Sequence, residues 1–161
     1  VVAEARRMIT FEVLGTPAPK GSGRAMLIGG KARHVPSGSN VNRDALKSWD
    51  VAVREAAINA VEIATCRDVV APMFVDTAIL ITIAFHMRRP AGHYRKDGTI
   101  KPSVPLRPKN KPDVSKLARA TEDALTGIVF DDDARIVDAY FSKLWALPGR
   151  EGATITVEVA R

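Results

Sequence analysis

The sequence predicts an α+β fold in which a mixed, mainly antiparallel sheet is combined with two main helices. Two observations predict it. Segments with strand-like alternation flank two segments with helical periodicity, without the repeating strand–helix–strand order of an α/β protein. The chain has 161 residues, 46% of them hydrophobic, which is enough to bury one core and too few for two comfortable domains. A single domain over residues 1–161 is therefore expected, with residues 1–7 as an N-terminal extension ahead of the first strand.

A strand, a hairpin and a long helix are predicted for the N-terminal half. Residues 8–14 (MITFEVL) alternate apolar and polar side chains with period two, which is typical of a half-buried strand. Residues 26–35 surround a pair of glycines and predict a hairpin. Between residues 41 and 63, apolar side chains recur at helical spacing. Trp49 lies on that apolar face, so we expect it to anchor the core rather than to serve as an exposed stacking platform.

The C-terminal half is predicted to contain four strands and a second helix. Residues 75–87 are rich in β-branched and apolar side chains, which favours a central strand. Residues 114–126 show helical periodicity and are followed by a glycine, which is typical of a helix end. A short apolar strand is expected at 128–130, followed by strands at 136–145 and 153–159.

A long basic segment, residues 88–112, separates the central strand from the second helix. It holds five prolines and eight cations against a single acid, Asp97. The cations are Arg88, Arg89, Arg95, Lys96, Lys101, Arg107, Lys109 and Lys111. A loop of this length inside a compact domain is usually functional or disordered. We therefore expect either a loop that contacts DNA or a disordered connection.

Composition indicates the cellular compartment of the protein and the class of molecule that it binds. The net charge of +6 fits a polyanionic partner, although solvated lysines alone produce a similar balance. The longest apolar stretch, residues 78–85, is far shorter than a membrane span, and the N-terminus lacks the apolar block of a signal peptide. Cys66 is the only cysteine, so no internal disulfide framework exists. These features predict a cytoplasmic protein without a membrane partner.

The sign of the charge reverses in the segment that follows, residues 113–133. Its acids outnumber its cations, Lys116 and Arg119. The acids are Asp113, Glu122, Asp123, Asp131, Asp132 and Asp133. Asp123 follows Arg119 by four residues, so an intrahelical ion pair is its simplest role. A cationic strip that leads into an acidic cluster is what an enzyme needs to hold a phosphodiester beside a metal ion.

The spacing of these acids predicts that they meet. A helix of about 13 residues advances roughly 20 Å, and five or six extended residues return nearly that distance. If the chain reverses at Gly127, Asp131 and Asp132 come back beside Asp113. Carboxylate oxygens suit Mg²⁺ or Mn²⁺. The alternative is that Asp113 only caps the helix and the aspartate triplet is a solvated turn.

Three sequence motifs together resemble the RusA-type Holliday junction resolvases. They are KPDVSKLARATEDALTG, IVFDDDARIVDAYFSK and, near the N-terminus, GTPAPKGSGR. The resemblance covers most of the chain, and its most specific part is residues 111–143. It implies a RusA-like fold and a Mg²⁺-dependent endodeoxyribonuclease that works as a homodimer and cuts two opposed strands of a four-way junction. It also suggests a phage or prophage origin, with roles in DNA recombination and repair.

The resemblance also assigns site residues. It implies Asp113 as the first metal-binding aspartate and Asp132 as the catalytic aspartate, with Asp131 beside it as a further metal ligand. Arg119 stands where the family usually has lysine and is expected to contact the scissile phosphate, with a different geometry. Ser115 replaces the family's second aspartate, which lowers metal affinity unless another oxygen compensates.

Three functional hypotheses follow. The first is hydrolysis of branched DNA with Mg²⁺, or Mn²⁺ as a substitute, bound by Asp113 and Asp132. The second is a non-catalytic protein that binds branched DNA through a degenerate metal site, and the third is an RNA-directed protein. In the first hypothesis the DNA backbones are held by cations. These are Lys20, Arg24, Arg88, Arg89, Arg95, Lys96, Lys109 and Lys111.

Overall fold

The computed structural model of the chain describes residues 8–21, 23–36 and 40–161. Its main sheet has four strands in the order β1-β6-β4-β5, and β2 and β3 form a separate hairpin. β1 and β4 both pair antiparallel with β6, whereas β4 and β5 run parallel. The predicted α+β fold with a mixed, mainly antiparallel sheet and two main helices is therefore confirmed. The elements are β1 (Met8–Leu14), β2 (Gly23–Ile28), β3 (Lys31–Pro36), α1 (Asn40–Thr65), β4 (Ile79–Met87), the 3-10 turn η1 (Ala91–His93), α2 (Val114–Leu125), the 3-10 turn η2 (Asp133–Arg135), β5 (Ile136–Trp145) and β6 (Gly152–Val159).

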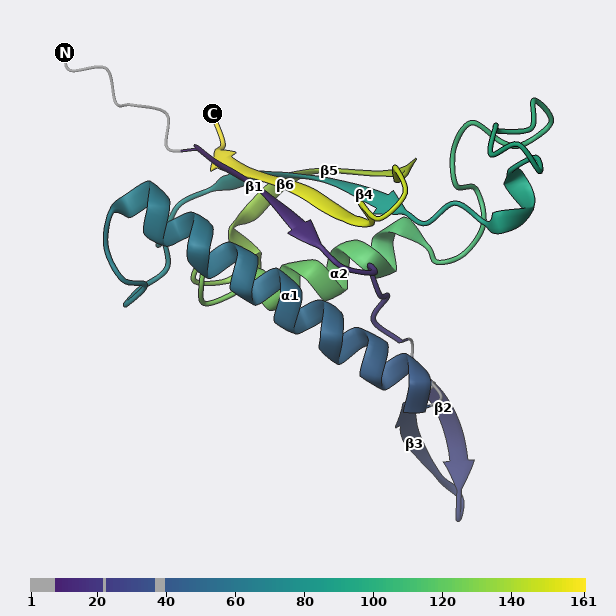
Figure 1. Cartoon of the computed structure of the whole chain (residues 1–161). Helices are drawn as coiled ribbons and strands as arrows, with labels where there is room; N and C mark the ends of the chain where they lie inside the picture. The colour runs from purple at the N-terminus through teal and green to yellow at the C-terminus, as the bar shows by residue number, and fades with distance from the viewer. Residues whose placement is uncertain (1–7, 22, 37–39) are drawn as a thin grey trace.

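The molecule has two layers, with both helices packed beneath one face of the sheet (Figure 1). The β2–β3 hairpin extends away from this body, beyond the start of α1, and the segment 88–112 projects from the far end of β4. No helix among the described residues is long and apolar enough to cross a membrane. Both helices cover the sheet and place the segments that follow them.

The core lies between the sheet and the two helices, because the strands alternate as their sequences predict. In β4, the four residues Ile79, Ile81, Ile83 and Phe85 are fully buried, while Thr82 between them is exposed. The neighbouring β6 buries its own alternate residues, Ala153, Ile155 and Val157, on the same side.

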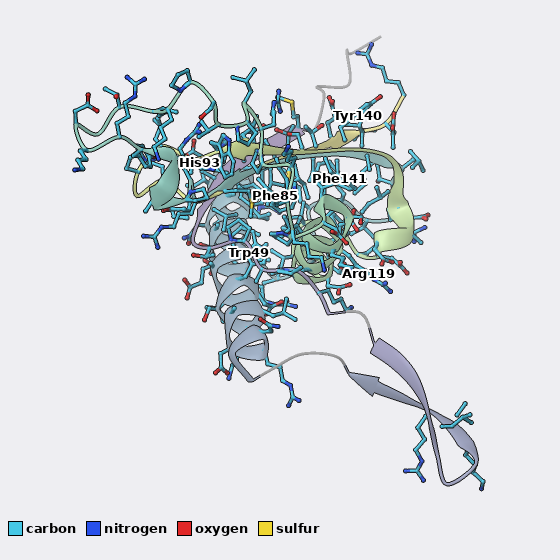
Figure 2. All side chains as sticks on the ribbon, turned by 90° about the vertical axis from the view of Figure 1, so that its right-hand side faces the viewer. Trp49, Phe85, His93, Arg119, Tyr140 and Phe141 are labelled. Carbon is cyan, nitrogen blue, oxygen red and sulfur yellow. The ribbon has the colours of Figure 1, made fainter. Side chains whose placement is uncertain are left out.

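Trp49 joins the two helices inside this core. Its side chain is only 1% exposed, and its Nε1 donates a hydrogen bond of 3.1 Å to Oγ1 of Thr121 on α2. Thr121 in turn donates to the carbonyl oxygen of Leu117, so the buried indole N–H and hydroxyl are both satisfied. The prediction that Trp49 anchors the core is confirmed (Figure 2).

Most boundaries lie within two residues of those expected, but two predicted strands differ. The strand expected at 75–87 begins at Ile79, because Asp76 has a φ of +46° and interrupts the extended backbone. The strand expected at 128–130 is absent from the described chain, where these residues form a buried turn. That turn changes the geometry of the acidic residues.

Candidate active site

Asp113 stands at the N-terminal end of α2 with an exposed carboxylate. It occupies the N-cap position with extended backbone, but its side chain makes no capping hydrogen bond. The side chain is 52% exposed, and its Oδ2 lies 3.4 Å from Nζ of Lys116. The Asp113 carboxylate therefore does not cap α2, although the capping alternative requires it to do so.

Lys143 on β5 holds the segment that leads into Asp113. Its Nζ donates to the carbonyl oxygens of Asn110 at 2.7 Å and Pro112 at 2.9 Å. Two residues further along β5, Trp145 donates from Nε1 to the carbonyl oxygen of Pro105 at 2.9 Å. The C-terminal end of β5 thus fixes residues 105–112 against the start of α2.

The C-terminal end of α2 is closed by a tight turn rather than by a returning strand. The N–H groups of Ile128 and Val129 both donate to the carbonyl oxygen of Leu125, and Gly127 donates to Phe130. Residues 128–130 are apolar because they pack into the core, not because they form a strand. The N–H of Asp131 then bonds to the carbonyl oxygen of Phe74, so the chain continues away from α2.

The aspartate triplet consequently stays at the end of α2 opposite to Asp113. The helix has 12 residues and separates its two ends by about 18 Å. Ligands of one Mg²⁺ each lie about 2.1 Å from the ion, so they cannot be so far apart. In the described ranges, no three His, Cys, Asp or Glu side chains gather closely enough to hold a metal ion. The expectation that the chain returns Asp131 and Asp132 to Asp113 is wrong for a single chain.

Asp131 is engaged by a neighbouring cation. Arg135 donates from Nε to Oδ1 at 3.2 Å and from a terminal nitrogen to Oδ2 at 3.1 Å. The N–H of Asp76 lies 3.4 Å from Oδ2, and its carboxylate also pairs with Arg135 at 3.2 Å. The hydrogen bonds from Arg135 lower the pKa of Asp131 despite an opposing effect of desolvation. The carboxylate of Asp131 therefore closes the turn that precedes β5.

Asp132 and Asp133 are exposed in that turn. Oδ1 of Asp132 accepts a 2.8 Å hydrogen bond from the N–H of Ala134, which caps η2. Asp133 acts on α2 through its charge: burial, then Asp133 and Asp123, raise the pKa of Glu122, while Arg119 lowers it. An excess of negative charge therefore surrounds this end of the helix.

Arg119 and Lys20 occupy the surface of α2 between its two ends. Arg119 is exposed on α2 (Figure 2). It follows Asp113 by six residues, which corresponds to about 9 Å along a helix. The predicted ion pair between Arg119 and Asp123 is not the one formed, because Asp123 pairs with Lys20. The N–H of Lys20 also donates to the carbonyl oxygen of Lys116 at 3.1 Å, so the segment before the hairpin is tied to α2.

The basic segment 88–112 is folded around Trp145. Arg89 lies over the indole ring, with its Cζ 5.1 Å from the ring centroid, and His93 meets the ring edge-to-face at 5.2 Å. Lys101 donates through its Nζ to Gly92, which closes the segment on itself. Five of the six predicted DNA-contacting cations in the segment are exposed and Arg89 is half-buried: Arg88, Arg89, Arg95, Lys96, Lys109 and Lys111. The side chain of Arg24 lies outside the described residues.

Three residues of this region were not singled out by sequence reasoning. Lys143, Trp145 and Arg135 all act through contacts that join distant segments or neighbouring turns. Only one signal was available beforehand: Lys143 and Trp145 are a charged and an aromatic residue at the end of a strand that is otherwise mostly apolar.

Comparison with known protein families gives one match. The family model described as Endodeoxyribonuclease RusA matches residues 19–159, which is most of the chain. No curated protein matches the sequence. The matched range includes both ends of α2, the basic segment and the complete sheet apart from β1. The chain therefore belongs to the RusA family of endodeoxyribonucleases, metal-dependent hydrolases of DNA phosphodiester bonds that act on branched DNA junctions.

Proposed function

We propose that this protein is a Mg²⁺-dependent resolvase of four-way DNA junctions that works as a homodimer in recombination and repair. The observation that carries the proposal is the division of the acidic residues between the two ends of α2. One chain holds half a metal site at each end. Two copies related by a two-fold axis would complete both halves.

Strand β5 offers the surface for such a pairing. It is an edge strand of 10 residues, with β4 on one side and no strand of the described chain on the other. Val137 is 63% exposed and Tyr140 is 59% exposed, an unusual apolar surface for an edge. Tyr140 points away from the helix layer (Figure 2). We infer that two β5 strands pair antiparallel about a two-fold axis.

This pairing joins opposite ends of α2 from the two copies. Asp132 lies just before β5, whereas Lys143, near the end of β5, holds the residue before Asp113. In an antiparallel pair, the start of one strand lies beside the end of the other. Asp113 of one copy then approaches Asp132 of the partner subunit. The same contact occurs twice, which suits two symmetric cuts in a two-fold junction.

The donor set fits the proposed metal. Mg²⁺ prefers oxygen ligands such as those of aspartate, and Mn²⁺ binds the same ligands. Asp113 and Asp132 are both exposed, whereas Asp131 becomes a ligand only if Arg135 releases one of its oxygens. Ser115 contributes a neutral hydroxyl one residue into α2. A divalent cation at this site supplies a Lewis acid for the phosphodiester and for the attacking water.

The cations of the chain then have separate tasks. Arg119 lies on the exposed side of α2 between the two carboxylate positions and contacts the scissile phosphate. Exposed cations of the segment 88–112 hold the DNA backbones, together with Lys20 and Arg24. Lys20 must exchange its partner Asp123 for a phosphate to do so.

Subunit complementation tests the shared site. Asp113→Asn and Asp132→Asn homodimers should both fail to cut a labelled four-way junction in Mg²⁺. A mixed dimer contains one site with both substitutions and one intact site, so mixing the two inactive variants should restore nicking of single strands. If Asp113 and Asp132 act within one chain, every site of the mixture is defective and no activity returns.

A second candidate function rests on Ser115. The exposed serine stands one residue into α2, where a carboxylate would complete the donor set beside Asp113. Two aspartates alone bind a divalent cation more weakly than three, and if that affinity is too low for cutting, the chain is a non-catalytic protein that binds branched DNA. Ser115→Asp separates the two functions: a gain from no detectable cutting supports the binding protein, whereas cutting by the unaltered chain excludes it.

A further inference from the structure

A pocket of about 280 Å³ lies between the end of β5 and the segment 88–112. Four of its lining residues are cations, namely Arg88, Lys109, Lys111 and Lys143. The others include the rings of His93 and Trp145 and four prolines, and no carboxylate is among them. Its volume is close to the lower end of ligand pockets, which begin at roughly 300 Å³. The pocket therefore combines flat apolar walls with a purely positive charge.

The walls of this pocket are held in place by contacts on their outer side. The Nε1 of Trp145 is bonded to the carbonyl oxygen of Pro105, and Arg89, which does not line the pocket, lies over the indole ring. Lys143 is fixed by the carbonyl oxygens of Asn110 and Pro112. A preformed pocket loses little conformational entropy when a ligand enters.

His93 contributes a polar atom that lacks a partner. Its Nδ1 is buried and has no hydrogen-bond partner among the described residues. Buried side-chain nitrogens nearly always have one, and leaving one unpaired costs stability. His93 lines the pocket, so a rotation of its ring would turn this nitrogen toward a ligand with a hydrogen-bonding edge. Nucleobases offer such an edge together with a flat face for stacking.

The position of the pocket points to the role of the ligand. Its wall residues Lys109–Pro112 run directly into Asp113, so the pocket borders the proposed metal site. We propose that the pocket receives one unpaired nucleotide next to the phosphodiester that is cut, with the base against His93 and Trp145 and its phosphate beside Lys109 and Lys111. This rests on the proposed function. Branched DNA supplies such a nucleotide at lower cost than a duplex, because its bases are more easily unpaired.

The test measures binding without cutting. Junctions that lack one base at successive positions around the crossover are titrated with protein in the presence of chelator, and fluorescence anisotropy reports affinity. His93→Ala should weaken binding of the intact junction roughly tenfold, because a stacked base contributes about that factor or more. The loss should vanish for the junction that lacks the base entering the pocket, since the two changes then remove the same interaction.

Two further variants distinguish the loss of the contact with the base from a loss of the folded structure. His93→Phe keeps a ring against Trp145 but removes Nδ1, and should give a smaller loss with the same dependence on base position. His86→Ala is the matched control, because His86 lies on the open sheet face, where it bonds to Thr154, and does not line the pocket. It should leave affinity unchanged at every position.

The remaining outcomes each contradict a different statement. If the unaltered protein does not prefer the junction to duplex DNA, the proposed function fails. If it binds the junction but neither His93 variant depends on base position, the nucleotide proposal is wrong. In that case Lys109→Ala and Lys111→Ala weakening all junctions equally would identify the pocket as a contact for backbone phosphate alone.

Discussion

The two ends of helix α2 differ in local charge and in whether a cation already engages their carboxylates. At the N-terminal end a single carboxylate, Asp113, is exposed among cations, and Lys143 fixes the segment before it. At the C-terminal end five acids lie in the last turn of α2 and in the turn before β5, and one of them, Asp131, is already engaged by Arg135. The first end suits a phosphate, whereas the second repels one unless a cation intervenes.

This difference shows that acids close together in the sequence can lie far apart in the structure. Asp132 follows Asp113 by 19 positions in the sequence. The helix of 12 residues between them is about 18 Å long and keeps the two carboxylates at its opposite ends. Each end is then an incomplete site within one chain. Substitutions at either end, and at the contact that would join the two ends, should therefore have different effects.

The largest effect is expected from removing one proposed ligand at either end. Asp113→Asn and Asp132→Asn should each reduce junction cutting by about a hundredfold or more, since several kcal/mol of charge stabilisation are lost. Junction binding, measured in chelator, should persist. Asp68→Asn, an exposed acid distant in sequence from α2, is the control and should cut normally. Normal cutting by either test variant would remove that residue from the mechanism.

A change at the strand edge tests the contact between the ends. Tyr140→Lys places like charges near one another across an antiparallel β5 pair, which destabilises it. Analytical ultracentrifugation should show a shift from dimer to monomer, with cutting reduced about tenfold and recovered at higher protein concentration. Thr82→Lys alters a neighbouring exposed position on β4 and should leave the dimer intact. A stable dimer of the Tyr140 variant would contradict the β5 interface.

Asp131 should differ from its neighbour Asp132. Because Arg135 lowers the pKa of Asp131, its carboxylate stabilises the fold at pH values above the ordinary pKa of 3.8, and this contribution disappears as the pH falls through the lowered pKa. Asp131→Asn should therefore destabilise the protein at neutral pH but much less in strong acid, while retaining more cutting activity than Asp132→Asn. Denaturant unfolding at several pH values measures the first effect. A pH-independent loss would mean that the ion pair is not responsible.

The contact between the helices is expected to matter for stability alone. Thr121→Val leaves the buried Nε1 of Trp49 without an acceptor, which costs about 1–3 kcal/mol of unfolding free energy. Thr121→Ser keeps the hydroxyl and should cost less. Denaturant titration of both variants checks the order, and an equal loss would show that the methyl group, rather than the hydrogen bond, is important.

The smallest effect is expected at Glu122. Its raised pKa means that the folded protein binds a proton more tightly than the unfolded chain, so stability falls as the pH rises from the ordinary value of 4.5 through the raised pKa. Glu122→Gln removes this dependence and should be slightly more stable than the unaltered protein at neutral pH. The advantage should vanish below pH 4.5. A variant that is less stable at neutral pH would show that the Glu122 charge is compensated.

Local patterns in the sequence were sufficient for most elements. Residues 8–14 and 153–159 alternate with period two and form strands within one residue of the predicted bounds, and the apolar spacing around Trp49 predicts α1 to within two residues. These elements are amphipathic, and amphipathic periodicity is recorded directly in the order of residues. The three apolar residues 128–130 carry no period, so a strand and a buried turn look alike there.

The sequence by itself determined the kinds of groups available: carboxylates for a metal, cations for phosphates, and the motifs that resemble the RusA family. Only the tertiary structure decided their spacing. A buried turn at Ile128–Phe130 keeps Asp132 away from Asp113, and Lys143 and Trp145 place the basic segment beside Asp113 through contacts that span more than 30 residues. Such contacts depend on which strands become neighbours, and no local pattern encodes that choice.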